Sequence, residues 1–408
     1  MDNVRKLLLR YGSPLYVYDK HCLEDRCKRM KQFEEDLKTG LCKDAAVSMH
    51  YAIKANSNPA ILKVVKQHGL KVDCMSPLEL RMNEISGFKA NEMLYVCNNI
   101  SVNEMKQAHD KGLLVCLDSI SQVETYGKVC PSTDIMVRIN PGVIGVGHSQ
   151  KVVTSGKATK FGISENNLKA LFNAAEKYHL RIIGTHQHLG SLFLNDKISD
   201  YIAGVKAGLH IVKQYFKDVE IVDLGGGFGV PYELGEKQLD FSLLKKELIP
   251  VLNAFIEEYP SVKEFKFEPG RYIPCEAGYL LGTVMAIKYE NGIWWIGTDI
   301  GMGMIARPTM YDSYHKITLP DTEEAHLITA NFCGNVCESG DILGKQRTVI
   351  LPKVGDAIVV HNAGAYGYSM ASNYTGRLRP AEVMIHGEND WELIRKAETT
   401  DDVLRMLP

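Results

Sequence analysis

Residues 46–53 read Ala-Val-Ser-Met-His-Tyr-Ala-Ile, a short apolar run that a helical pattern follows at 58–68. Seven similar runs come after it. Most are rich in Val and Ile and bounded by Gly, Asn, Asp, Ser or Pro, as is typical of buried parallel strands. They are Leu70–Met75, Met93–Cys97, Leu113–Leu117, Ile135–Ile139, Ile182–His188, Ile221–Leu224 and Phe265–Glu268. Each is followed by a helix or a candidate helix, and eight such units in roughly 240 residues favour a (β/α)8 barrel over an open sheet.

Helical periodicity is clearest between the strands. The patterns are Asn58–His68, Pro77–Ile85, Val102–Lys111, Glu165–Tyr178, Ile198–Phe216 and Phe241–Tyr259, and several begin at a Ser, Asn or Asp that can cap a helix. The segment Pro141–Gly162 is different, because it is rich in Gly, Ser and Lys. It predicts a long loop at the carboxyl end of a strand.

The sequence changes character after about residue 275. Gly282–Glu290 and Ile293–Asp299 flank Asn291-Gly292, a strong signal for a two-residue hairpin. Further candidate strands are Thr348–Pro352, Ala357–Asn362 and Ala381–His386, and Pro14–Tyr18 near the N-terminus is also strand-like. The expected fold class is therefore α/β: a (β/α)8 barrel at 29–275, plus a C-terminal mainly β domain at 276–408 that also recruits residues 1–28.

Composition excludes several classes of protein. The chain has 408 residues, 45% of them hydrophobic and 24% charged, which is ordinary for a globular protein. Its 47 basic and 49 acidic side chains give a net charge of −2, so a nucleic-acid partner is not expected. No apolar run reaches the roughly 18–20 residues of a membrane span, and Met1–Arg10 does not resemble a signal peptide. Ten cysteines without a CxxC spacing predict reduced thiols and a cytoplasmic location.

Polar residues at the ends of the predicted strands are the candidate site, because barrel enzymes carry their chemistry there. Lys54 directly follows the first strand, where it could form a Schiff base or extend to the rim as an ordinary surface lysine. His186 and His188 lie on one face of the sixth strand. The two histidines could bind a metal ion together, or one ring could lie against a planar cofactor. They could also be ordinary histidines packed in the protein interior. No clear set of carboxylate ligands accompanies them in the sequence, so no metal is expected.

The last two strands add a phosphate cradle and an acid. Gly225-Gly226-Gly227-Phe228-Gly229 follows the seventh strand, where backbone N–H groups can approach a phosphate; the alternative is a tight turn. Glu268-Pro269-Gly270-Arg271 ends the eighth strand. Lysine, aromatic ring, phosphate cradle and carboxylate together describe a pyridoxal phosphate site. There the acid would keep the pyridine nitrogen protonated, so that the ring can accept electrons.

Several ordered motifs resemble the fold type III, alanine-racemase-like family of pyridoxal phosphate-dependent decarboxylases, and most closely its branch acting on meso-diaminopimelate. The motifs are Tyr11–Asp19, His50–Asn56, His188–Ser191, Gly225–Gly229, Glu268–Arg271, Cys337-Glu338-Ser339-Gly340-Asp341 and Gly364-Ala365-Tyr366. The resemblance covers nearly the whole chain. It implies a barrel and a β domain that work as a homodimer with shared active sites.

The resemblance also implies a role for each matching residue. Lys54 would be the Schiff-base lysine and Cys337, contributed across the dimer, the proton donor to Cα. The other cofactor-binding residues would be Asp73, Arg138, His188, Ser191, Gly226, Gly227, Glu268, Gly270, Arg271 and Tyr366. Racemases of this fold typically place an arginine near the ring nitrogen, so Glu268 favours decarboxylation.

The substrate is expected to be an amino acid with a second charged end. Arg307-Pro308-Thr309-Met310-Tyr311-Asp312 resembles the substrate segment of the diaminopimelate enzymes. There Arg271, Arg307 and Tyr311 would receive the distal carboxylate and Glu338 the distal ammonium, with Tyr366 also in contact. Charged pairing of this kind is strong, and a buried arginine without its carboxylate is costly. Conversion of meso-2,6-diaminopimelate to L-lysine and CO2 is therefore the expected reaction.

Other functions remain open from the sequence. A relative could decarboxylate ornithine, lysine, carboxynorspermidine or a carrier-bound amino acid. A zinc hydrolase could use His186 and His188. A catalytically silent regulatory homologue is a third class, although such a protein would be expected to lose Lys54 or Cys337. One departure from the family pattern is Gln187, where many relatives carry a small residue.

Overall fold

A computed structural model describes residues 2–143, 146–147, 154–156, 159–320 and 326–408. The chain forms two compact units. Unit 1 comprises Met1–Asp25, Pro231–Glu236 and Ile273–Pro408, and unit 2 comprises Arg26–Val230 and Lys237–Tyr272. The expected division after residues 28 and 275 differs from this one by a few residues, and it gives the short segment 231–236 to the barrel.

Unit 2 is a closed parallel barrel. Its eight strands are β2 (Ala46–Ala52), β3 (Lys71–Cys74), β4 (Met93–Val96), β5 (Leu114–Leu117), β6 (Asp134–Asn140), β9 (Arg181–His186), β11 (Ile221–Gly226) and β12 (Glu264–Glu268). They run in the order β5-β4-β3-β2-β12-β11-β9-β6, and a further pairing of β5 with β6 closes the ring. The α/β barrel prediction is confirmed, and every predicted strand overlaps an observed one.

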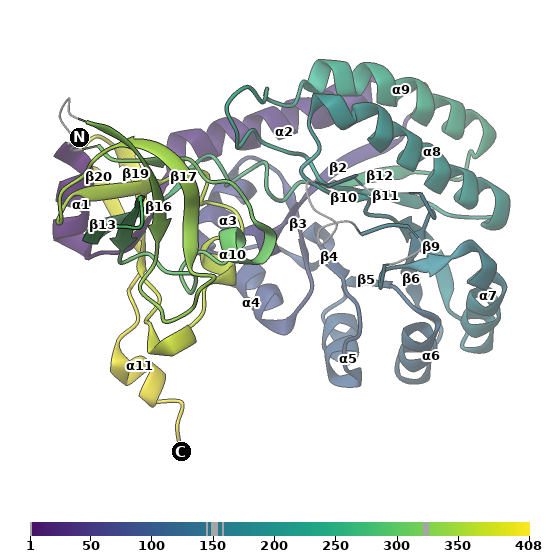
Figure 1. The fold of residues 1–408 in the computed structure, drawn as a ribbon. Coiled ribbons are helices and arrows are strands. Elements are labelled where there is room, and N and C mark those ends of the chain that lie inside the picture. Colours follow the sequence, from purple (N-terminus) through teal and green to yellow (C-terminus); the bar gives the residue numbers. More distant parts are fainter. Residues whose placement is uncertain (1, 144–145, 148–153, 157–158, 321–325) are drawn as a thin grey trace. The chain divides into compact units, whose positions relative to one another are not determined.

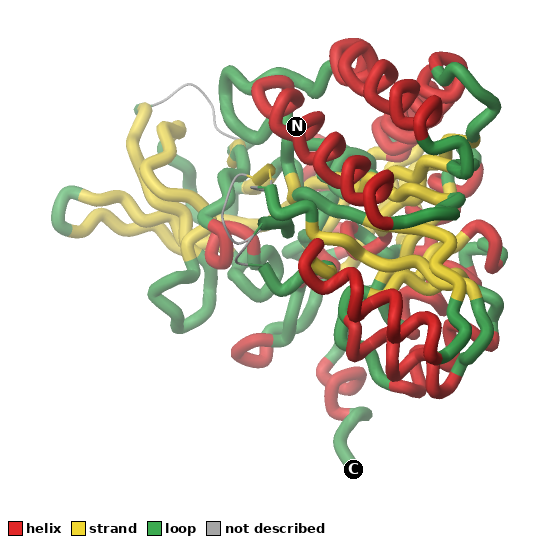
Figure 2. The backbone as a smooth tube through the Cα atoms, turned by 90° about the vertical axis from the view of Figure 1, so that its right-hand side faces the viewer, coloured by secondary structure: helices red, strands yellow, loops and turns green. Residues whose placement is uncertain are grey.

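Helices surround the strands of unit 2 (Figures 1 and 2). They are α3 (Pro59–Gln67), α4 (Pro77–Ile85), α5 (Val102–Asp110), α6 (Ile120–Val129), α7 (Leu168–Lys177), α8 (Ile198–Tyr215) and α9 (Phe241–Glu258). The expected caps are present: the side chains of Asn58, Ser76 and Asp240 accept hydrogen bonds from backbone N–H groups of the first turns of α3, α4 and α9. These bonds satisfy donors that a helix start would otherwise leave unpaired.

The expectation that each strand precedes a helix is wrong for the eighth strand. After β12 the chain runs through turns into the β13 strand (Gly278–Glu290). The helix next to β12 instead precedes the barrel: it is α2 (Lys20–Gly40). Phe33 of α2 lies 6.2 Å from the ring of Phe267 on β12 and 4.9 Å from Phe241 at the start of α9. The outward face of β12 is thus covered by an N-terminal helix.

Unit 1 is built around a mixed sheet. Its strands are β1 (Leu15–Asp19), β13, β14 (Ile293–Thr298), β15 (Ile317–Thr318), β16 (Leu327–Cys333), β17 (Ile342–Ile350), β18 (Ala357–Val360), β19 (Ala381–Gly387) and β20 (Asp390–Arg395), and its helices are α1 (Asp2–Tyr11), α10 (Arg307–Tyr311) and α11 (Thr400–Leu404). The main path is β17-β16-β14-β13-β1-β19-β20, with β18 on β13 and β15 on β18. The N-terminal β1 pairs with both β13 and β19, so the expected recruitment of this segment is confirmed.

Details of the β prediction differ from the structure. The Asn291-Gly292 hairpin is confirmed, because Glu290 pairs with Ile293 and both turn residues have positive φ angles. The predicted strand Thr348–Pro352 is only the end of the longer β17, and β16 and β20 were not predicted. Part of the predicted loop Pro141–Gly162 lies outside the described residues; its described part includes β7 (Val146–Gly147), which pairs with β10 (Gly190–Ser191), and β8 (Ile163–Ser164) follows it.

Candidate active site

The carboxyl ends of the barrel strands carry a cluster of ionisable side chains. Lys54 follows β2 in the short helical turn Ile53–Ala55, and its Nζ lies 3.8 Å from Oδ2 of Asp73 on β3. The Lys54 side chain is 39% exposed, whereas that of Asp73 is 5% exposed. Burial raises the pKa of Asp73 well above its usual value, although the nearby Lys54 acts to lower it. Asp73 can therefore hold a proton beside an accessible amine.

An acid and an imidazole meet inside the barrel. His186 Nε2, at the end of β9, lies 3.2 Å from Oε2 of Glu268, at the end of β12, and each side chain is at most 2% exposed. Burial lowers the pKa of His186 although Glu268 acts to raise it, so the ring is neutral. Burial acts to raise the pKa of Glu268, but His186 and Lys54 outweigh it and lower that pKa. Glu268 is therefore a carboxylate that accepts a hydrogen bond from His186.

Asp223 of β11 lies beside this pair. It is the register partner of His186, and its Oδ1 accepts a hydrogen bond from the N–H of Gly225 at 2.8 Å. Burial first, and then the charge of Glu268, raise the pKa of Asp223 well above its usual value. Two adjacent buried acids rarely ionise together, so Asp223 is the neutral one. Asp223 was not among the site residues predicted from the sequence.

The triple glycine lets β11 approach its neighbours closely. A Cβ on Gly226 would lie 1.9 Å from the carbonyl oxygen of Glu268, so only glycine fits between β11 and β12. Gly225 has a φ of +69°, and its Cβ would lie 2.4 Å from the carbonyl oxygen of Gln187. The N–H of Gly226 donates to Nδ1 of His188 at 3.1 Å. Burial lowers the pKa of His188 well below its usual value, so this neutral ring carries its proton on Nε2.

Ser191 and Arg271 lie together at the same end of the barrel. The guanidinium of Arg271, which is 4% exposed, donates to Ser191 Oγ at 3.3 Å. Between Glu268 and Arg271, Gly270 is buried. The N–H of Ala52 donates to the carbonyl of Pro269 at 3.0 Å, which joins the strand before Lys54 to the segment that carries Arg271.

Arg138 of β6 contributes a buried cation. It is 9% exposed, its guanidinium lies 4.4 Å from the ring centroid of Phe161, and its Nη2 has no hydrogen-bond partner among the described residues. Together with the residues above, this places all the barrel residues proposed for cofactor binding at or near the carboxyl ends of strands in unit 2.

Unit 1 carries the remaining predicted residues. Cys337 and Glu338 lie on the exposed loop between β16 and β17. Buried Asp341 organises this loop, because its carboxylate accepts hydrogen bonds from the N–H groups of Val336 at 3.0 Å and Met302 at 2.6 Å. The thiol and the acid are therefore presented from a loop with an ordered base.

The helix α10 adjoins that loop. Thr309 Oγ1 donates to the carbonyl of Gly340 at 2.9 Å. Arg307, which is 2% exposed, donates to Ser313 Oγ at 3.1 Å, and its guanidinium lies 5.9 Å from the ring centroid of Tyr311. Unit 1 thus brings the proposed substrate residues of α10 next to the loop of the proposed proton donor.

Two tyrosines complete this part of unit 1. Tyr374 donates to a carboxylate oxygen of Glu338 at 2.8 Å, which orients that acid. Tyr366 has a φ of +56° and follows Gly364, where a Cβ would lie 1.7 Å from the carbonyl oxygen of Pro274. The turn that carries Tyr366 is therefore fixed by close backbone packing.

Pyridoxal phosphate fits the residues of unit 2. Oε1 of Glu268 is buried with no hydrogen-bond partner among the described residues, as expected if it awaits a ring nitrogen. The glycines after β11 leave backbone without side chains, and Ser191 and Arg271 offer donors of the kind a phosphate needs. Lys54 supplies an accessible amine. This barrel and site define a vitamin B6-dependent enzyme.

Comparisons with known proteins identify the family. Residues 24–275 match the model of the pyridoxal-dependent decarboxylase, pyridoxal binding domain. The diaminopimelate decarboxylase of Methanothermobacter thermautotrophicus is 32% identical over 97% of this chain and 91% of its own length. Two crystal structures of diaminopimelate decarboxylases with L-lysine are also similar. The structure from M. jannaschii has 28% sequence identity and a TM-score of 0.87, and the match covers 98% of this chain and 93% of that chain. The structure from Helicobacter pylori has 26% sequence identity and a TM-score of 0.85, and the match covers 98% of each chain.

The chain belongs to the pyridoxal-dependent decarboxylase family. It is a carboxy-lyase whose cofactor is pyridoxal phosphate. The resemblance that the sequence motifs indicated is confirmed by these matches, which extend over both units.

The metal pair considered from the sequence is not the grouping that the structure shows. His186 lies with Asp223 and Glu268, and one potential ligand atom of each lies within 4.8 Å of the others. His188 is outside this group, and its Nδ1 already accepts the N–H of Gly226. Two carboxylic side chains thus lie beside His186, although no clear set of carboxylate ligands was recognisable in the sequence. This grouping was not predicted because Asp223 and Glu268 lie on other strands, and only the barrel register brings them to His186.

Gln187 is accommodated by glycines of α8. It is 2% exposed, and its Nε2 donates to the carbonyl of Gly204 at 3.5 Å. A Cβ on Gly208 would lie 1.7 Å from Gln187 Oε1. The larger residue therefore points to the helix, away from His186 and His188 on the opposite face of the strand end.

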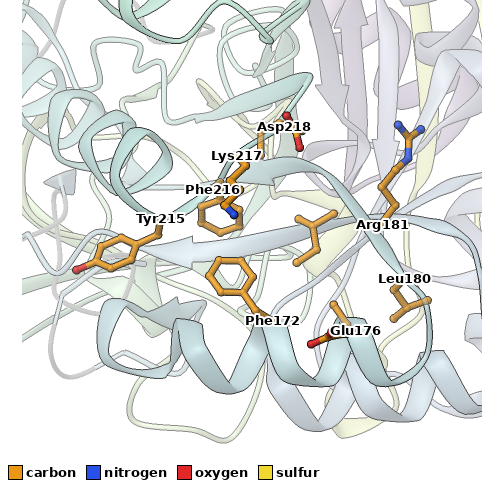
Figure 3. Close-up of a pocket in the computed structure, with 11 residues that line it drawn as sticks. Phe172, Glu176, Leu180, Arg181, Tyr215, Phe216, Lys217 and Asp218 are labelled. Atoms are coloured by element: carbon orange, nitrogen blue, oxygen red, sulfur yellow. The ribbon is translucent and has the colours of Figure 1, made fainter.

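A separate pocket of about 710 Å³ lies at the other end of the barrel (Figure 3). It is lined by Phe172, Ala175, Glu176, Leu180, Arg181, Ile182, Tyr215, Phe216, Lys217, Asp218 and Val219. These residues belong to α7, the end of α8, the first residues of β9 and the segments leading into β9 and β11, so the pocket is at the amino ends of the strands. No residue predicted for the active site lines it.

Proposed function

We propose that this chain decarboxylates meso-2,6-diaminopimelate to L-lysine and CO2, acting in the cytoplasm as a homodimer with shared active sites. The observation that carries the substrate is similarity along nearly the full length to enzymes named diaminopimelate decarboxylase. The structural support is the buried guanidinium of Arg307, which is suited to a second carboxylate. Ornithine and lysine lack that group.

The residues of unit 2 would hold the cofactor. Lys54 would bind its aldehyde carbon, Glu268 its ring nitrogen, and Ser191 with Gly226 and Gly227 its phosphate. His188 would lie against the ring. When bound, pyridoxal phosphate supplies a protonated ring that accepts the electron pair left behind by the departing carboxylate.

The chain's own residues would then manage protons and orientation. Asp73 beside Lys54 can take or return a proton at Nζ. Glu268, kept ionised by His186, would hold the proton on the ring nitrogen. Cys337 of the partner subunit would deliver a proton to Cα. Arg307 and Tyr311 would bind the distal carboxylate and Glu338 the distal ammonium, which fixes which end of the substrate reacts.

The cofactor attachment can be tested by mass spectrometry. Borohydride reduction should fix pyridoxal phosphate on the peptide that contains Lys54, and Lys54→Ala should abolish both the adduct and lysine release. Direct competition among meso-diaminopimelate, ornithine and lysine then tests specificity. Turnover of ornithine or lysine in preference to meso-diaminopimelate would refute the substrate, and stoichiometric zinc without cofactor absorbance would favour the hydrolase.

Shared sites can be tested by mixing two inactive variants. Lys54→Ala and Cys337→Ala lesions lie on different units of the chain. If each site uses Lys54 of one protomer and Cys337 of the other, half of the re-assorted dimers would be mixed and each would hold one intact site. Roughly a quarter of wild-type activity should then return. No recovery despite subunit exchange would contradict sharing.

For the cytoplasmic location, the support is that none of the ten cysteines, all of them described, forms a disulfide.

A further inference from the structure

Three buried polar atoms at the carboxyl end of the barrel lack hydrogen-bond partners among the described residues. They are Oε1 of Glu268, Nδ1 of His186 and Oδ2 of Asp223. The side chains come from β12, β9 and β11, and β11 lies between the other two strands. Buried polar atoms are normally paired, so three of them within one small cluster need an explanation.

The chemistry of these groups suggests a direction for their protons. A neutral imidazole has one donor nitrogen and one acceptor nitrogen. Because Nε2 of His186 faces the carboxylate of Glu268 at 3.2 Å, Nε2 is the donor and Nδ1 is left as the acceptor. A protonated Asp223 has one O–H to donate, and its Oδ1 is already occupied by the N–H of Gly225. Oδ2 of Asp223 and Nδ1 of His186 are not hydrogen-bonded to each other in this structure, but the two side chains belong to one cluster whose potential ligand atoms lie within 4.8 Å of one another. Oδ2 of Asp223 is therefore the atom placed to supply a proton to Nδ1.

We propose that His186 is a positioning residue that, backed by a protonated Asp223, holds Glu268 as a carboxylate with Oε1 directed to the ring nitrogen of the cofactor. The proton order would be Asp223 O–H to His186 Nδ1, a hydrogen bond that the structure does not itself contain, and His186 Nε2–H to Glu268 Oε2, which it does. No bond other than these hydrogen bonds forms or breaks. The inference rests on the proposed placement of the ring nitrogen at Glu268, and it deepens that placement.

The surrounding charges are compatible with this order. The barrel groups acting on the cluster are Lys54, Asp73, Arg138, His188 and Lys266. Arg138 and Lys54 disfavour a second positive charge on His186, and Asp73 disfavours a second negative charge on Asp223. Burial acts in the same direction on both. Lys266 acts the other way on Asp223, lowering its pKa, but burial is the largest influence and raises it. The balance thus favours a neutral acid, a neutral imidazole and one carboxylate.

The test measures the dissociation constant of pyridoxal phosphate from the apoenzyme and the 15N chemical shift of the bound ring nitrogen, using 15N-labelled cofactor. His186→Ala removes a hydrogen bond to a charged group and should weaken binding about 10- to 150-fold, with the ring nitrogen shifted toward its unprotonated value. Asp223→Asn keeps an acceptor for Gly225 and a donor for His186, so it should stay within about threefold of wild type, whereas Asp223→Ala should weaken binding roughly 2- to 12-fold.

Controls separate this idea from general damage. Gln187→Ala alters the adjacent buried position, whose side chain points to α8, and should leave both readouts unchanged. If His186→Ala does not fold, His186→Gln retains a donor toward Glu268 and should give an intermediate shift. The Asp223 pair tests the proton order without touching His186.

The outcomes that overturn the inference are distinct from those that overturn the cofactor placement. Unchanged affinity and 15N shift in His186→Ala would remove its positioning role. Equal damage from Asp223→Asn and Asp223→Ala would show that Asp223 acts as a carboxylate. If Glu268→Gln itself left the 15N shift unaltered, the ring nitrogen would not lie at Glu268, and the placement would fail together with this inference.

Discussion

Gly226→Ala is the sharpest test of how the backbone shapes the site. In the native chain a Cβ at this position would lie 1.9 Å from the carbonyl oxygen of Glu268 and 2.8 Å from its carbonyl carbon. Real Cβ contacts are not shorter than 3.0 Å, so β11 and β12 must separate by 3.0 − 1.9 = 1.1 Å or more. The obstacle is backbone, which cannot rotate away as a flexible side chain can.

A displacement of this size has two expected effects. Overpacking in a well-packed interior typically costs about 1–3 kcal/mol of stability, which for a unit of this size corresponds to a Tm lower by roughly 2–12 °C. Misplacement by about 1 Å at a catalytic centre can cost roughly 100-fold in rate. Because Glu268 moves with β12, we expect weaker binding of pyridoxal phosphate and a fall of about 100-fold in kcat/KM.

The assay combines cofactor titration, lysine release and thermal unfolding. Gly297→Ala is the matched control, because its Cβ would meet Ala286 at an ordinary 3.5 Å and its φ is not positive. A Gly226→Ala enzyme with near-native cofactor affinity and kcat/KM would refute the reasoning, since the close approach of β11 to β12 would then not determine the geometry at Glu268.

Three further predictions concern the substrate, the proton donor and acid stability. Arg307→Lys should raise KM for meso-diaminopimelate by about tenfold or more, because an ammonium cannot pair bidentately with a carboxylate, while cofactor affinity stays native; an unchanged KM would contradict the role of Arg307. Cys337→Ser should lower kcat about 100- to 10,000-fold with little change in KM, as measured by steady-state lysine release, and an undiminished kcat would exclude the thiol as proton donor. Burial, and then the charge of Lys266, lower the pKa of His50 to about 3. Between about pH 6.5 and pH 3, His50 is therefore protonated in the unfolded chain but neutral in the folded chain. Chemical denaturation should show the free energy of unfolding falling by up to about 1.4 kcal/mol per pH unit as the pH drops through this range. His50→Phe should flatten this slope relative to His210→Ala, an exposed histidine; an unchanged slope would assign the acid sensitivity to other groups.

The barrel was predictable because its strands are marked locally. Runs such as Leu113–Leu117 are apolar, short and bounded by turn residues, and these features depend only on neighbouring positions. The helix α2 was not predicted, because its role depends on barrel closure. The helix α2 precedes the first barrel strand but covers the eighth strand, β12. Nothing in the βα repeat itself indicates that this helix takes the place of one after β12.

The motif residues of the candidate site were predictable, but their supporting contacts were not. Glu268 and the glycines are recognisable in the sequence, whereas the pairing of His186 with Glu268 requires the lateral order of β9, β11 and β12. A local signal did exist: Lys266 and Glu268 alternate with Phe265 and Phe267, which puts charged residues on the inner face of a strand. Inward-facing charges of this kind must find partners across the barrel.

Charged side chains lie inside the barrel at two heights, one near the amino end of β12 and one at its carboxyl end. Comparing them shows what distinguishes a structural network from a binding site. Toward the amino end of β12, Glu264 pairs with Lys266 at 2.9 Å and accepts a hydrogen bond from Ser48 at 2.6 Å, and Lys266 lies 3.2 Å from Nε2 of His50. The charged groups near the amino end therefore find their partners within the barrel. At the carboxyl end, Glu268 retains a buried oxygen without a partner in the described chain. A buried hydrogen-bond acceptor without a partner costs about 1–3 kcal/mol, and more when it is charged. The contacts of Glu264 on the same strand show that this barrel can provide partners for a buried carboxylate. The unsatisfied oxygen is therefore best explained by a ligand that donates a hydrogen bond to it, and the donor we propose is the protonated ring of pyridoxal phosphate.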